Sequence, residues 1–257
     1  IATVTRQKYL TASEKGPWAN SYDRWRNDNL THRYQGVQFG YTSAGRYTSW
    51  EDIWSYNIYK DRDILPGDYK YEDWNGDGEI NGQDEHPFAF DQTPWLNYSL
   101  NIGLEYKNFD FNMLLQGSAL GSMEYKEPLY SIWGTNGGGT LEQYLDRWHP
   151  NDPTADPYDP ATTWTSGHYG YTGRYPKSNS EFNRVSTAYL RLKSIEVGYT
   201  LPRISRMPNV SLRVYANAYN LLTFTGVKFV DPEHPDDDLG RMYPLNKTYT
   251  LGLSLSF

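Results

Sequence analysis

The segment between residues 73 and 84 carries the most specific chemical signal in the sequence. Its oxygen-bearing side chains have the spacing of an EF-hand calcium loop, and they belong to Asp73, Asn75, Asp77, Glu79 and Asp84. Such side chains converge on one point, while Gly78 at the sixth position permits the sharp turn. We expect Ca²⁺ or Mg²⁺ to bind here, with Glu79 offering its backbone carbonyl group.

The same residues also fit a loop that holds no metal. Asp and Asn side chains accept hydrogen bonds from nearby backbone N–H groups, so an Asx-rich turn can stabilise itself. The surrounding charge favours a cation, because residues 51–91 contain 12 Asp and Glu residues against three Lys and Arg residues. Both interpretations therefore stay open, and the metal is the one we expect.

Other patterns that carry chemistry are missing from the sequence. It contains no cysteine, and its five histidines are scattered without the spacing of a zinc site. Nucleophile-elbow and phosphate-loop motifs are also absent. We therefore expect no enzymatic activity. The net charge of −7 without a basic stretch argues against a nucleic-acid partner.

A long aromatic segment at 119–186 is the second candidate for binding. Flat aromatic rings stack on the apolar faces of sugars, and neighbouring amides and carboxylates bind hydroxyl groups. The residues that we expect to contact an oligosaccharide or a peptide are Tyr130, Trp133, Trp148 and Trp164. The alternative is that these rings form a small core of the segment itself or dock on a partner protein.

The elements that position these segments are long strands. Apolar and polar residues alternate with period two through 95–106, 109–117, 187–201, 210–222 and 247–257. The first two runs flank Lys107-Asn108 and predict a tight antiparallel hairpin. The third run changes phase near Lys193 or Ser194, which indicates a β-bulge.

Strand length and loop length together point to a membrane. The runs have about the 9–11 residues that a tilted strand needs to cross a bilayer. Two short connections alternate with long ones at 51–94, 119–186 and 223–246. Barrels of the outer membrane show this asymmetry, with the long loops outside the cell. The sequence thus predicts an all-β, antiparallel transmembrane barrel segment.

Six ordered blocks resemble one family. They are LPGDYKYEDWNGDGEINGQDEHPF, TPWLNYSLNIGLEYKNFDFNMLLQGSALGS, YLDRWHP, STAYLRLKSIEVGYTLP, LRVYANAYNLLTFTG and YPLNKTYTLGLSLSF. Together they are similar to the C-terminal part of SusC/RagA-like TonB-dependent transporters of the Bacteroidetes outer membrane. The resemblance covers residues 35–257. The five residues of the acidic loop match the family's DxNxDG block, and Phe257 matches its terminal aromatic residue.

The resemblance implies the C-terminal strands of a 22-stranded barrel, with 1–257 as one part of a longer polypeptide. It implies import of oligosaccharides or peptides with a SusD-like surface lipoprotein, driven by TonB through a missing N-terminal part. The acidic segment 51–94 and the aromatic segment 119–186 are then extracellular loops, outer-membrane lipid surrounds the strands, and Phe257 is a signal for barrel assembly.

A second hypothesis is a secreted, calcium-stabilised β-sandwich that binds carbohydrate on its own. A sandwich needs shorter strands of about six residues, and it covers one face of each sheet with the other sheet. Strand length and the covering of the apolar face therefore distinguish the two hypotheses.

Overall fold

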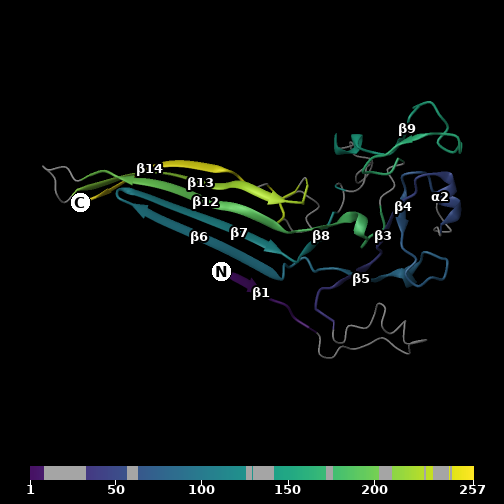
Figure 1. The fold of residues 1–257 in the computed structure, drawn as a ribbon, viewed down its shortest axis with the longest axis horizontal. Helices are drawn as coiled ribbons and strands as arrows, with labels where there is room; N and C mark the ends of the chain where they lie inside the picture. The colour runs from purple at the N-terminus through teal and green to yellow at the C-terminus, as the bar shows by residue number, and fades with distance from the viewer. Residues whose placement is uncertain are drawn as a thin grey trace.

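The computed structural model describes residues 1–8, 33–56, 63–125, 129, 142–171, 176–202, 210–228, 230–233, 243 and 245–257. One large sheet of long strands extends from a smaller, irregular head, which we define as residues 33–94 and 121–187 within these ranges (Figure 1). The described part is almost entirely strands, turns and irregular structure, which confirms the all-β prediction.

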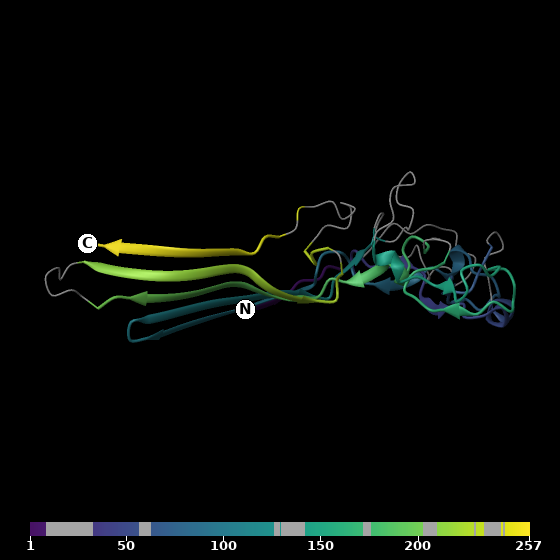
Figure 2. The same ribbon diagram turned by 90° about the horizontal axis from the view of Figure 1, so that it is seen from above.

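The large sheet has six antiparallel strands in the order β1-β6-β7-β12-β13-β14. Their bounds are Ala2–Val4 for β1, Leu96–Tyr106 for β6, Phe109–Ala119 for β7, Tyr189–Thr200 for β12, Ser211–Thr225 for β13 and Thr248–Ser256 for β14. The five strands predicted from alternation are confirmed. The sheet is open, with β1 and β14 at its edges, and Figure 2 shows it edge-on as a gently curved layer.

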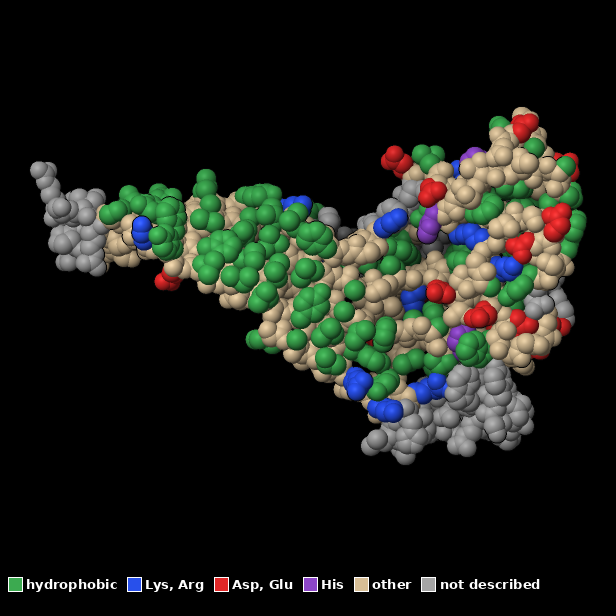
Figure 3. Space-filling model, in the orientation of Figure 1, with side chains coloured by type: hydrophobic (Ala, Val, Ile, Leu, Met, Phe, Trp, Pro, Cys, Tyr) green, Lys and Arg blue, Asp and Glu red, His purple; other side chains and the backbone are tan. Residues whose placement is uncertain are grey.

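Alternation in the sequence gives this sheet one apolar and one polar face. The register pairs Leu100 with Leu115 and Val214 with Leu253, so apolar side chains line up across the strands. Leu253 is 72% exposed, and Figure 3 shows apolar side chains covering the visible face of the sheet. Among the described residues, no second sheet packs on this face, which argues against the β-sandwich hypothesis.

The predicted bulge is confirmed in β12. The register with both neighbouring strands shifts between Leu192 and Ser194, at the position where the alternation changes phase. On β13, Asn220 lies opposite this shift with a positive φ of 52°. An extra residue keeps the apolar side chains on one face on both sides of the bulge.

The head is built from short elements. Four two-stranded sheets join β2 (Gln38–Gly40) to β5 (His86–Ala89), β3 (Ser43–Arg46) to β4 (Tyr69–Tyr71), β8 (Ser122–Glu124) to β11 (Arg184–Ser186), and β9 (His149–Pro150) to β10 (Trp164–Thr165). The helical turns are α2 (Trp50–Ser55), η1 (Gly82–Asp84), η3 (Glu142–Leu145) and η4 (Glu181–Asn183). No helix among the described residues is both long and apolar enough to cross a membrane.

The core of the head is aromatic. Tyr41, Tyr69, Tyr71 and Ile80 are buried together, and Phe182 packs against them. Tyr69 and Phe182 meet edge to face with their ring centroids 4.8 Å apart. These rings join β3–β4, the acidic loop and η4 into one unit.

Short and long connections leave the large sheet from opposite ends. The short turn after β6, the end of β12 and the start of β13 lie at one end, and the head lies at the other (Figure 1). Because β1 pairs with β6, the first long connection spans residues 5–95 and is longer than the 51–94 predicted. Lys107 adopts the positive φ of 56° that a tight hairpin turn requires.

Candidate functional site

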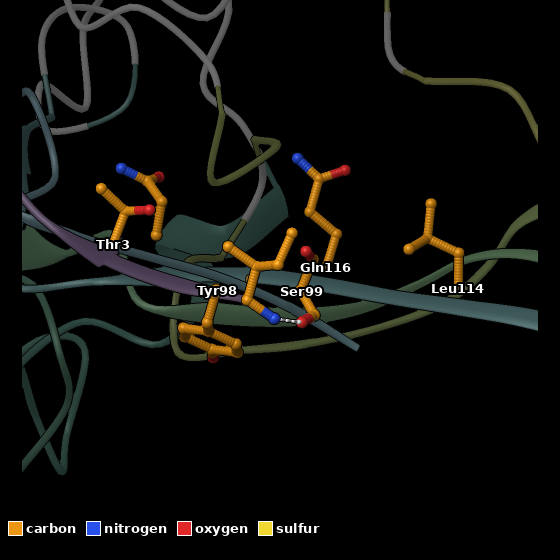
Figure 4. A pocket seen from close by; sticks show the side chains of 8 residues that line it. Thr3, Tyr98, Ser99, Leu114 and Gln116 are labelled. Atoms are coloured by element: carbon orange, nitrogen blue, oxygen red, sulfur yellow. Dashed lines mark hydrogen bonds between the residues drawn. The ribbon is translucent and has the colours of Figure 1, made fainter. Parts of the chain in front are cut away.

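A polar groove lies on the polar face of the sheet where the strands reach the head. One cavity of about 330 Å³ is lined by Thr3, Asn97, Ser99 and Gln116, among others. In Figure 4, Thr3, Ser99 and Gln116 point to one side of the strands, and Tyr98 points to the other. The register explains this arrangement, because Asn97 faces Thr3 and Ser99 faces Gln116 across neighbouring strands.

A second cavity of about 380 Å³ continues the groove toward the head. It shares Asn97 and Gln116 with the first, and its other walls include Ser118, Thr187 and Glu233. The term polar groove denotes these two cavities together. Most of the polar side chains in the lining are amides and hydroxyls, which suit a ligand that donates and accepts hydrogen bonds.

One buried arginine holds the segment that borders the groove. Arg191 on β12 is 1% exposed, and it donates to Asp231 Oδ2 at 2.5 Å and to Glu233 Oε2 at 2.6 Å. Its Nε donates to the Thr223 hydroxyl at 3.0 Å, and the Tyr189 hydroxyl donates to Glu233. A buried cation needs such partners, so Arg191 fixes residues 231–233 against the strands.

A charged network occupies the same face near the turn end. Arg213 donates to Asp110 and to Glu196, the latter at 2.7 Å. These residues line an open cavity of about 620 Å³ together with Glu105 and Lys107. The polar face therefore carries one charged cluster at the border of the polar groove, around Arg191, and a second one near the turns, around Arg213.

Comparison with known proteins shows which family has this sequence pattern. No family model matches the chain. It is 30% identical over 209 residues to TonB-dependent receptor P3 of Formosa agariphila, covering 76% of this chain and 19% of that protein. It is 26% identical over 228 residues to TonB-dependent receptor SusC of Bacteroides thetaiotaomicron, covering 88% and 20%. The chain belongs to the SusC/RagA-like TonB-dependent receptors. It spans about a fifth of the length of these curated relatives.

Solved structures of the RagAB peptide importer share the fold. The RagAB peptide importer in its open-open state matches with a TM-score of 0.57 and 19% identity, over 97% of this chain and 25% of that one. Its closed-closed state matches with a TM-score of 0.54 and 20% identity, over 85% and 23%. The open six-stranded sheet is thus a portion of the fold that these longer chains have.

The acidic loop of this TonB-dependent receptor is bonded to itself. Asp73 accepts backbone N–H bonds from Gly76 at 2.8 Å and Gly78 at 2.9 Å, and Asp77 accepts one from Glu79 at 2.8 Å. Asp84 is fully buried and accepts from Trp74 at 3.0 Å.

Burial raises the pKa of the Asp84 carboxyl above its ordinary value, against the opposing effect of backbone N–H bonds from Asn81, Asn75 and Trp74. Asn81 also accepts from Gln83, which completes the cap of η1. In the described part of the chain, no group of three or more His, Asp or Glu side chains is placed to hold a metal ion. The hydrogen bonds of the loop fit both interpretations, because a carboxylate that accepts an N–H bond keeps lone pairs for a cation, and ion binding stays a prediction.

Trp148 and Trp164, two of the four aromatic residues proposed to bind ligand, do not line the polar groove. Trp148 is 8% exposed and packs over Gly67 in the head. Trp164 on β10 is partly exposed and meets Tyr171 edge to face at 5.3 Å. Tyr130 and Trp133 fall outside the described residues. Phe257 follows β14 and is 97% exposed, and its role in assembly stays a prediction.

The groove residues were not singled out from the sequence, although a signal existed for some of them. Asn97, Ser99 and Gln116 occupy polar positions of the predicted strands, so their common face followed from the alternation. Asp231 and Glu233 carry no periodic signal, because they follow the end of a strand and flank a proline. Only the folded chain shows that they meet Arg191.

Proposed function

We propose that this chain is the C-terminal part of an outer-membrane transporter barrel, with its apolar face in lipid and its polar face lining the passage. The observation that carries the proposal is the two-faced sheet, whose five long strands have 9 to 15 residues. A tilted strand crosses a bilayer with about 9–11 residues. Exposed leucines such as Leu251 and Leu253 are costly in water and favourable in hydrocarbon.

The cargo that we propose is an oligosaccharide or a peptide, taken up together with a SusD-like lipoprotein and with energy from TonB. The amide and hydroxyl side chains of the polar groove support a hydrogen-bonding cargo. The likeness to RagAB, which is described as a peptide importer, supports peptides. TonB would act through parts of the receptor outside these 257 residues.

The head lies outside the cell in this proposal. Every long connection of the large sheet leaves from the head end, and the short β6–β7 turn lies at the opposite end. Outer-membrane barrels place long loops outside and short turns in the periplasm.

Cysteine labelling tests this orientation, since the chain has no cysteine of its own. Tyr158 in the head is 56% exposed, and Lys107 lies in the β6–β7 turn. In intact cells producing the whole receptor, a membrane-impermeant maleimide should label Tyr158→Cys and not Lys107→Cys. After lysis both variants should be labelled. Labelling of Lys107→Cys alone in intact cells would contradict the orientation, and equal labelling of both would contradict the membrane location.

A further inference from the structure

We propose that Arg6 and Lys8 form a binding site for the anionic head group of a membrane lipid, at the border between the apolar face of the sheet and the head. The inference rests on the proposed membrane location, and it adds a ligand that is not cargo.

The site is organised by aromatic rings. Arg6 Cζ lies 5.4 Å and Lys8 Nζ 5.3 Å from the centroid of the Tyr34 ring. The Tyr34 ring packs edge to face on Trp95 at 4.9 Å, which anchors it above the start of β6.

The backbone around these cations is held by hydrogen bonds. Thr5 donates to the Trp95 carbonyl at 2.7 Å, and Gln35 donates to the Gln7 carbonyl at 2.9 Å. Lys8 and Tyr34 form an antiparallel bridge. Arg6 and Lys8 therefore lie at a defined position, immediately beyond β1.

This position is the edge of the apolar face. Val4 pairs with Leu96, the first residue of β6, and is 62% exposed. Arg6 follows two residues later, and Trp95 also contacts Phe90 edge to face at 5.2 Å. Figure 3 shows Lys and Arg side chains gathered at the lower border of the apolar face. Aromatic rings at the end of an apolar band mark the depth of the lipid head groups in membrane proteins.

The positive charges of Arg6 and Lys8 attract an anion. Arg6 and Lys8 share one aromatic ring, and within the described residues neither has a carboxylate within ion-pair distance. Two neighbouring cations repel each other, and a phosphate between them would bind both. The chain as a whole carries a net charge of −7, so this attraction for an anion is local. A lipid fits better than free phosphate because its acyl chains can lie on the apolar face beside Val4.

Native mass spectrometry of the whole receptor tests the site. The receptor is reconstituted into vesicles of equal parts phosphatidylglycerol and phosphatidylcholine, then released in neutral detergent, and the retained lipids are counted. Wild type should retain more phosphatidylglycerol than phosphatidylcholine. In the double variant Arg6→Gln, Lys8→Gln, the ratio of retained phosphatidylglycerol to retained phosphatidylcholine should fall about fivefold for each cation removed.

The matched control is the double variant Lys107→Gln, Lys228→Gln, which removes the same charge elsewhere. Lys107 also lies over a tyrosine ring, 5.2 Å from the centroid of Tyr106, but at the turn end of the sheet. The control should retain phosphatidylglycerol as wild type does. No preference in wild type, an unchanged preference in the double variant, or an equal loss in the control would overturn the lipid site. Failure of the receptor to insert into the vesicles would instead overturn the proposed membrane location.

Discussion

Arg213 on β13 and Asp110 on β7 form an ion pair across the strand that separates them. Arg213 Nε donates to Asp110 Oδ1 at 3.0 Å, and its Nη2 donates to Oδ2. The intervening strand β12 presents Gly198 at this level, opposite Asp110. A Cβ added to Gly198 would lie 2.4 Å from Arg213 Nη2 and 2.5 Å from Asp110 Oδ1. The two side chains meet because Gly198 has none.

We predict that Gly198→Ala separates this pair and weakens the sheet slightly. The partners are partly exposed, so the loss in free energy of unfolding should be about 1 kcal/mol. Denaturant unfolding of the receptor in detergent measures it. Gly103→Ala on the same face is the control, since its Cβ would meet only Asn112 Oδ1, at 3.1 Å. Equal effects of the two substitutions would refute the role of Gly198.

The ion pair between Arg213 and Asp110 could not be predicted from the sequence, although the strands that carry it could. Unbroken period-two patterns predicted the long strands, and a change of phase predicted the bulge at Leu192/Ser194, because both signals are local. The contact between Arg213 and Asp110 depends on the register of strands 103 residues apart. The pattern within a single strand does not show which residues of distant strands lie side by side. The head was not predicted in detail either, since strands of two to four residues show no alternation.

A second prediction concerns Arg191 and the segment that it holds. Arg191→Gln removes two charged contacts and leaves Asp231 and Glu233 without their cation. Because both carboxylates are partly exposed, the local cost should be about 2 kcal/mol, below that of a fully buried pair. Hydrogen exchange at residues 230–233 should then quicken about 30-fold. Lys228→Gln, which removes a nearby charge, should leave exchange unchanged, and unchanged exchange in Arg191→Gln would contradict the prediction.

A third prediction separates packing from ligand binding at Trp148. Gly67 has a φ of +92°, and a Cβ there would lie 2.4 Å from Trp148 Cγ. Gly67→Ala should therefore destabilise the head by about 2 kcal/mol, and Trp148→Ala by about 3–5 kcal/mol. Urea unfolding followed by tryptophan fluorescence measures both. Trp148→Phe preserves most of the packing, so uptake should persist, and loss of uptake with the head intact would show that Trp148 binds cargo.

A fourth prediction is a pH dependence of the head. Lys177 Nζ lies 3.9 Å from the centroid of the Tyr41 ring, and burial lowers the pKa of Lys177 to about 8. In the unfolded chain, the Lys177 ammonium group keeps its proton up to its ordinary pKa of 10.5. Between these values the unfolded state binds more protons, so stability rises with pH. Burial raises the pKa of Tyr41, and that group opposes the rise only above about pH 10.

Melting temperatures of wild type and Lys177→Met between pH 7 and pH 10 measure this effect. The wild-type value should rise relative to that of the variant as the pH passes through about 8, because only wild type loses a buried charge. Parallel curves for the two proteins would show that the Lys177 ammonium group is not responsible.

The last prediction distinguishes an ion-binding loop from a self-bonded one. Asp77 Oδ1 accepts from the Glu79 backbone at 2.8 Å, and Oδ2 accepts from Asn75 Nδ2 at 2.8 Å. Asp77→Ala removes these bonds whether or not an ion binds, so a loosened loop would be ambiguous. Asp77→Asn keeps an acceptor for the Glu79 N–H group and removes the charge that a hard cation requires. Calorimetric titration should show one Ca²⁺ bound to wild type and weaker binding to Asp77→Asn. Equal calcium content and equal melting temperatures, with and without chelator, would establish the self-bonded turn.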